Sequence, residues 1–78
     1  MSNSRIILLT GATRGLGRSL VERFTAAGHR VVGCGRSAEH VAALRATFGS
    51  PHRFDVVDVT DDAAVAAWSR ELVAAGLV

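Results

Sequence analysis

The chain has 78 residues, of which 49% are hydrophobic and 21% charged, and its formal net charge is +2. This length allows one small domain, or part of one, and excludes two, because globular domains mostly contain about 100–150 residues. The apolar content argues against disorder, no apolar run approaches the roughly 20 residues that span a bilayer, and the N-terminus lacks the apolar core of a secretory signal. A soluble, cytoplasmic protein is expected, and the single cysteine, Cys34, fits a reducing compartment.

All nine cationic residues are arginines, because the sequence contains no lysine. They are spread along the chain among seven carboxylates, whereas a nucleic-acid-binding surface gathers its basic residues on one face. No nucleic-acid or membrane partner is therefore expected.

Residues 5–10 form a short apolar run before Gly11, which is typical of a strand buried on both faces of a parallel sheet. From residue 16 the hydrophobic period becomes helical, and Gly28 ends the predicted helix. The expected apolar face of this helix comprises Leu16, Leu20, Val21, Phe24 and Ala27.

The next two units repeat this pattern. Residues 30–35 predict a second strand, after which Ser37 is placed to cap a helix that ends at Gly49. Residues 53–58 predict a third strand, and Thr60 or Asp61 can cap a third helix with Gly76 as its end. The expected buried side chains of the two helices are Val41, Leu44 and Phe48 in the first and Val65, Trp68 and Leu72 in the second.

Strands and helices that alternate with short connections favour right-handed crossovers in one parallel sheet. The sequence thus predicts an α/β fold with βαβαβα connectivity and a three-stranded parallel sheet in the order 3-2-1.

A glycine-rich turn, Thr10-Gly-Ala-Thr-Arg-Gly-Leu-Gly17, joins the first strand to the first helix. Gly11 allows the tight turn, Gly15 lets backbone N–H groups approach an anion, and Gly17 permits close packing of helix on sheet. A helix N-terminus with unpaired N–H donors favours a pyrophosphate at this place. A Walker A loop is excluded, because Arg18 follows Gly17 where that loop has its lysine.

The spacing T-G-x-x-x-G-x-G resembles the short-chain dehydrogenase/reductase superfamily, and Asp58-Val59 resembles the adenine-contacting turn of that family. The resemblance implies a partial Rossmann fold in which residues 1–78 form the N-terminal half of a dinucleotide-binding domain. It implies a cofactor site made of Gly11, Thr13, Arg14, Gly15, Leu16, Gly17, Arg36, Ser37, Asp58 and Val59.

The residue after the second strand selects between the two nicotinamide dinucleotides. A carboxylate there binds the ribose 2′-hydroxyl of NAD, whereas an arginine accommodates the 2′-phosphate of NADP. The sequence has Arg36 at this place, and Arg14 in the glycine turn could reach the same phosphate. NADP(H) is therefore the expected cofactor, with Ser37 as a further possible donor unless its hydroxyl only caps the helix.

The resembled family transfers a hydride between nicotinamide and an alcohol or carbonyl carbon, using a tyrosine and a lysine. The sequence contains neither residue, so the 78-residue chain alone is expected to be inactive, with the catalytic residues lying beyond Val78. The alternative is a non-catalytic nucleotide-binding or interaction module. In either case the first strand lacks an outer neighbour, which predicts a fragment of a longer protein or an edge-paired homo-oligomer.

The cysteine and the histidines favour structural roles. Cys34 is expected to pack as a small buried side chain, and Trp68 to belong to the core. His29, His40 and His52 lack the spacing of zinc ligands, so no metal is expected.

Overall fold

A computed structural model describes residues 5–12 and 15–77 of the chain. Three strands alternate with three helices, as the sequence predicts: β1 (Ile6–Leu9), α1 (Gly15–Ala26), β2 (Arg30–Gly35), α2 (Ala38–Phe48), β3 (Arg53–Val56) and α3 (Asp62–Ala74). The third strand ends at Val56 rather than Asp58, because the chain turns at Asp58.

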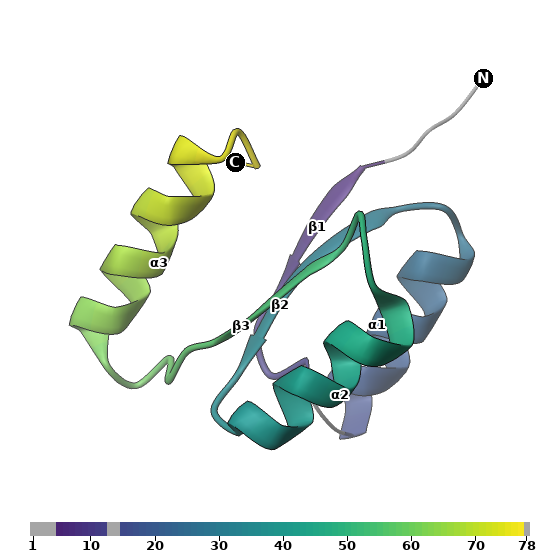
Figure 1. Cartoon of the computed structure of the whole chain (residues 1–78), viewed down its shortest axis with the longest axis horizontal. Helices are drawn as coiled ribbons and strands as arrows, with labels where there is room; N and C mark the ends of the chain where they lie inside the picture. The colour runs from purple at the N-terminus through teal and green to yellow at the C-terminus, as the bar shows by residue number, and fades with distance from the viewer. Residues whose placement is uncertain (1–4, 13–14, 78) are drawn as a thin grey trace.

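The strands form one parallel sheet in the order β1-β2-β3, with α1 and α2 on one side and α3 on the other (Figure 1). The register places Leu8 beside Val32 and Val32 beside Arg53. The α/β class, the parallel sheet and the strand order are those predicted. All three strands run in one direction, so their carboxyl ends lie at the same edge of the sheet.

A separate core lies on each face of the sheet. Side chains from successive strand residues point to opposite faces, so Val31 belongs to one core and Val32 to the other. The core under α1 and α2 contains Ala12, Val21, Val31, Val41, Leu44 and Phe54. The core under α3 contains Val32, Cys34, Val57, Trp68, Leu72 and Leu77.

The helix ends follow the sequence signals closely. The Ser37 side chain caps α2 by accepting from the His40 N–H at 3.3 Å. Asp61 rather than Thr60 caps α3, because the Thr60 hydroxyl donates to Asp58. Gly76 follows α3 with φ +73°, and the next N–H bonds back to the Leu72 carbonyl, which closes the helix.

Two expectations about burial are wrong. Ile6 and Leu8 on β1 are 45% and 51% exposed, because the core under α3 includes residues of β2 but none of β1. Leu16 is 76% exposed and Ala27 is exposed, so the buried face of α1 is narrower than expected and depends on Val21. No helix in the described part of the chain combines the length and apolar character needed to cross a bilayer.

Candidate functional site

The glycine turn brings the end of β1 against the start of α1. Gly11 and Gly15 have φ values of +64° and +60°, which L side chains rarely adopt. Ala12, which lies between these two glycines in the sequence, is fully buried. Its N–H donates to the Cys34 carbonyl at 3.0 Å. The turn is therefore held on the central strand, next to the carboxyl ends of β1 and β2.

Gly17 has a different role from the one expected. A Cβ at this position would overlap the Gly11 carbonyl, and it would lie 3.2 Å from the Ala12 Cα. The close approach is thus between the helix and the turn, not between the helix and the sheet. A side chain at position 17 would push the first turn of α1 away from the loop that it follows.

A cavity of about 540 Å³ lies at the carboxyl ends of the three strands. One wall comes from the chain between β2 and α2, the other from the chain between β3 and α3, and Gly11 contributes from the glycine turn. Ligands of open α/β sheets bind at this edge. The lining consists of Gly11, Gly35, Arg36, Ser37, His40, Val57, Asp58, Val59 and Thr60.

Asp58 forms a tight turn on one wall of this cavity. Its Oδ1 accepts hydrogen bonds from the Thr60 hydroxyl at 2.6 Å and from the Thr60 N–H at 2.9 Å. These bonds, together with the positive charge of Arg36, lower the pKa of Asp58 below its usual value. Asp58 therefore remains a carboxylate at neutral pH, able to accept a further hydrogen bond.

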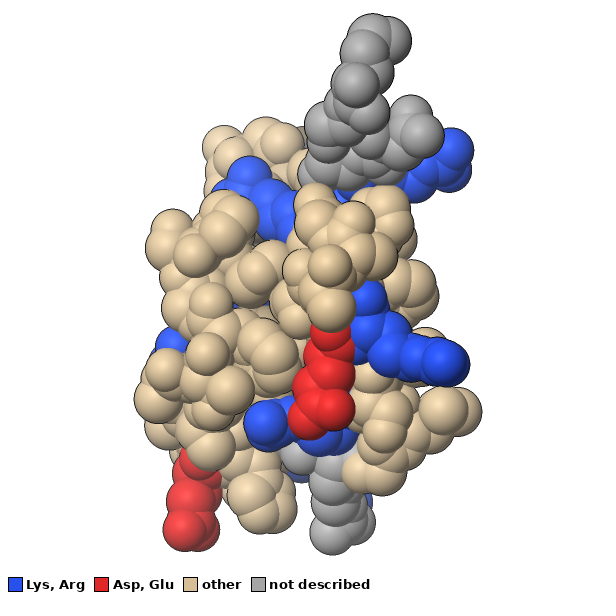
Figure 2. Space-filling model, turned by 90° about the vertical axis from the view of Figure 1, so that its right-hand side faces the viewer, with Lys and Arg blue, Asp and Glu red and all other residues tan. Residues whose placement is uncertain are grey.

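Arg36 and Ser37 form the opposite wall, directly after β2. The Ser37 hydroxyl accepts the His40 N–H as the cap of α2, which leaves its own proton available for donation. On the face seen in Figure 2 the blue arginine side chains are interspersed with uncharged and acidic ones. That face therefore shows no broad, purely basic surface.

The structure brings together half of the predicted site residues. Gly11, Arg36, Ser37, Asp58 and Val59 line the cavity. Gly15, Leu16 and Gly17 lie at the start of α1, outside this lining, and Thr13 and Arg14 lie outside the described residues.

Four lining residues were not predicted from the sequence: Gly35, His40, Val57 and Thr60. His40 could have been found from its spacing, because it follows the capping Ser37 by three residues and so shares its face of the helix. Thr60 could have been found from the Asp-x-Thr pattern of a side-chain-stabilised turn.

Of the residues expected to be structural, Cys34 and Trp68 lie in the core under α3, whereas His40 is exposed and lines the cavity. Cys34 is 1% exposed, and burial raises the pKa of its thiol. Trp68 is 5% exposed, and its Nε1 donates to Asp55 at 2.8 Å. His29 and His52 each accept a backbone N–H through Nδ1, from Arg5 and Val31 respectively.

Comparison with known proteins gives a consistent result. The family model described as short chain dehydrogenase matches residues 5–75. A serine 3-dehydrogenase of Rhizobium radiobacter is 44% identical over 61 residues, covering 78% of this chain and 24% of its own length. An NADPH-dependent pterin aldehyde reductase of Arabidopsis thaliana is 35% identical over 72 residues, covering 90% of this chain and 30% of its own length.

Solved structures show the same similarity. A short-chain dehydrogenase from Streptomyces avermitilis superposes with a TM-score of 0.83 at 30% identity, over 94% of this chain and 27% of that one. The closed form of serine dehydrogenase complexed with NADP+ gives a TM-score of 0.77 at 35% identity, over 81% and 25% of the two chains. The chain therefore spans only about a quarter to a third of the length of these relatives.

Proposed function

Since the chain belongs to the short-chain dehydrogenase family, we propose that it is the NADP(H)-binding portion of an oxidoreductase. The bound nicotinamide would exchange a hydride with an alcohol or carbonyl carbon of a small-molecule substrate. The described residues would hold the adenosine part and the pyrophosphate of the cofactor.

The observation that carries the choice of NADP(H) is the placement of Arg36 in the cavity, immediately after β2. A guanidinium binds phosphate through paired, charge-assisted hydrogen bonds. The neighbouring lining residues, Gly35 and Ser37, carry no negative charge that would repel the 2′-phosphate. A NAD-specific site would instead have a carboxylate at this end of the strand.

The remaining residues fit the other parts of the cofactor. A Cβ at Gly15 would face open space, so the backbone there is accessible to a pyrophosphate beside the N-terminus of α1. The Asp58 carboxylate would accept the adenine amino group, and Val59, which is 48% exposed, would lie beside the ring. The Arabidopsis thaliana relative is named as NADPH-dependent, and the solved serine dehydrogenase is complexed with NADP+, which supports the same cofactor.

Replacement of Arg36 tests the proposal. The Arg36→Asp variant should lose about 10–100-fold in affinity for NADPH relative to NADH, because it removes the paired hydrogen bonds and adds repulsion. Calorimetric titration of the full chain with both cofactors measures this ratio. Arg70→Asp, on the exposed part of α3, is the matched control for charge. An unchanged ratio in Arg36→Asp would refute the assignment.

We further propose that β1 pairs with another strand along its outer edge. Within the described residues β1 pairs with β2 alone, and Ile6 and Leu8 are exposed beside the unpaired edge. The partner is a later segment of a longer protein or a second copy of this chain. Sedimentation of the 78-residue chain should therefore show dimers or larger species, whereas a stable monomer would contradict pairing between copies.

A further inference from the structure

We infer that His40 is a specificity-determining residue of the cavity, where it binds the 2′-phosphate of the adenosine together with Arg36. This inference rests on the proposed function and adds a residue to it. It stands on three observations: the position of His40 on the cavity wall, the charges that line the cavity, and the hydrogen bonds around α2.

His40 lies on the same wall as Arg36 and Ser37. All three line the cavity, and Ser37 and His40 are three residues apart at the start of α2, where side chains at this spacing are neighbours on one face. The Ser37 Oγ accepts the His40 backbone N–H, so this part of the main chain is held by the helix cap. An anion bound between Arg36 and Ser37 would therefore lie next to the imidazole.

The charges lining the cavity leave room for a second basic group. Arg36 is the one arginine among the described lining residues, and Asp58 on the opposite wall carries a negative charge that interacts with it. A 2′-phosphate brings nearly two negative charges and several acceptor oxygens, so it can be shared by Arg36, by the predicted Arg14, which lies outside the described residues, and by a further donor on the cavity wall. His40 is the other described lining residue whose side chain can donate a hydrogen bond from a ring or guanidinium nitrogen.

The hydrogen bonds of the described residues leave the imidazole available to a ligand. His29 and His52 use Nδ1 to accept backbone N–H groups, whereas the bond at His40 involves its main-chain N–H. A neutral imidazole offers one N–H donor and an imidazolium offers two. An N–H of the His40 imidazole can therefore donate a hydrogen bond to a phosphate beside it.

The test uses 2′,5′-ADP and 5′-AMP, which differ only in the 2′-phosphate and occupy the part of the site that the described residues form. Calorimetry on the full chain gives the ratio of the two affinities. In His40→Ala this ratio should fall about tenfold, while the affinity for 5′-AMP changes less than about twofold. In His40→Arg the ratio should return to the value of the unsubstituted chain or exceed it, because the guanidinium again offers N–H donors to the phosphate.

Arg70→Ala serves as the control for the loss of a basic side chain away from the cavity, and its ratio should equal that of the unsubstituted chain. The inference is overturned if the unsubstituted chain prefers 2′,5′-ADP and His40→Ala keeps that preference. It is also overturned if His40→Ala weakens both nucleotides equally, since His40 would then serve the adenine or the fold. If the unsubstituted chain binds neither nucleotide, the proposed function fails as well.

Discussion

At the scale of single residues, backbone contacts explain the glycine turn better than side-chain chemistry does. The φ of Gly17 is not in the left-handed region, so its backbone conformation does not require glycine. Glycine is required there because a Cβ would overlap the Gly11 carbonyl. The sequence pattern predicts that this position must be small, but it identifies the wrong neighbour. The contact depends on the angle at which α1 leaves the turn, and no residue type encodes that angle by itself.

The Gly17→Ala substitution should lower the free energy of unfolding by about 1–3 kcal/mol or more, because the backbone of the turn has to shift. Urea denaturation of both proteins measures the difference. Ser19→Ala, on the exposed side of α1, is the matched control and should change stability by less than about 0.5 kcal/mol. Equal stability of Gly17→Ala and the unsubstituted chain would contradict the described contact.

Capping residues illustrate how much a local pattern can predict. Ser37 caps α2 as its sequence position indicates. The sequence left Thr60 and Asp61 as equal candidates for α3, and the structure selects Asp61 because Thr60 is bound to Asp58. That choice depends on a hydrogen bond between two residues of one turn, which also shapes the cavity wall.

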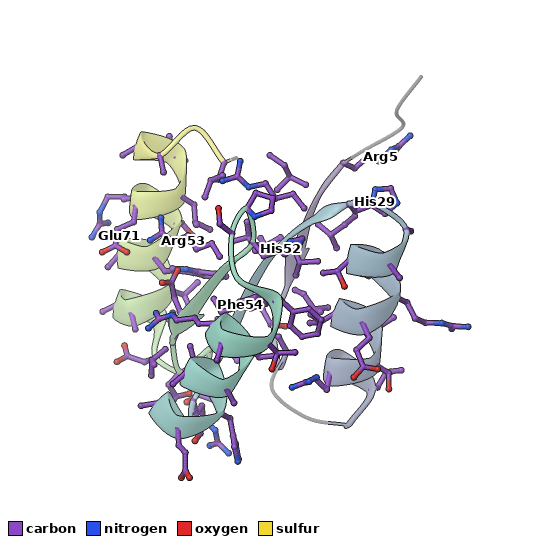
Figure 3. The ribbon with its side chains drawn as sticks, turned by 45° about the vertical axis from the view of Figure 1, so that its right-hand side comes forward. Arg5, His29, His52, Arg53, Phe54 and Glu71 are labelled. Carbon is purple, nitrogen blue, oxygen red and sulfur yellow. The ribbon has the colours of Figure 1, made fainter. Side chains whose placement is uncertain are left out.

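At the scale of elements, two histidines have equivalent positions in successive βα units. His29 precedes β2 and accepts the Arg5 N–H at 3.1 Å, and His52 precedes β3 and accepts the Val31 N–H at 3.1 Å. Figure 3 shows both imidazoles at the ends of the strands, with Arg5 beside His29. Each imidazole thus accepts a backbone N–H at the start of a neighbouring strand and adds one hydrogen bond at the edge of the ladder. The sequence did not predict this role.

The stability of the chain should depend on pH through His52. Burial, and to a smaller extent the charge of Arg30, lowers the pKa of His52 below its usual 6.5. The unfolded chain therefore binds this proton more readily, so the free energy of unfolding should fall as the pH decreases below 6.5. Above that pH His52 is neutral in both states and contributes no pH dependence.

The His52→Asn variant tests this dependence, because an amide oxygen can accept the Val31 N–H without titrating in this range. Urea denaturation between about pH 8 and pH 5.5 should give a weaker pH dependence for the variant than for the unsubstituted chain. Ser69→Asn, on the exposed side of α3, should keep the dependence of the unsubstituted chain. Identical slopes for His52→Asn and the unsubstituted chain would refute the role of His52.

At the scale of the whole molecule, Asp55 connects the two sides of the sheet. It accepts from Trp68 Nε1 at 2.8 Å and from Arg53 Nε at 2.7 Å, and it lies 3.5 Å from Arg45 Nη2. Arg53 also bonds to Glu71, so a chain of polar contacts joins α2, β3 and α3 (Figure 3). The sequence did not predict this role of Asp55, because its partners come from three different elements.

Removing this carboxylate should loosen α3 from the sheet. In Asp55→Ala the Trp68 N–H loses its partner in a partly buried position, so the free energy of unfolding should fall by about 1–3 kcal/mol. Asp62→Ala at the start of α3 is the exposed control. Loss of the tryptophan near-ultraviolet dichroism should accompany unfolding at a lower urea concentration. A stability equal to that of the control would contradict the connecting role.

The fold as a whole was predictable because strand direction and order follow from short crossovers, which constrain the topology strongly. The exposure of β1 was not predictable, because the hydrophobic pattern shows which side chains a strand can bury but not whether a helix covers them. Ile6 and Leu8 have the apolar character of a covered strand and remain exposed. The place of the cavity was predictable, because it lies at the carboxyl ends of the parallel strands. Its full lining was not, because residues that face each other across the cavity are far apart in the sequence.

The central claim is that the cavity at the strand ends selects the 2′-phosphate of NADP(H). Calorimetric titration of the unsubstituted full chain with NADPH and with NADH tests it most directly. NADPH should bind at least about tenfold more tightly than NADH. Tighter binding of NADH, or no heat of binding with either dinucleotide, would contradict it.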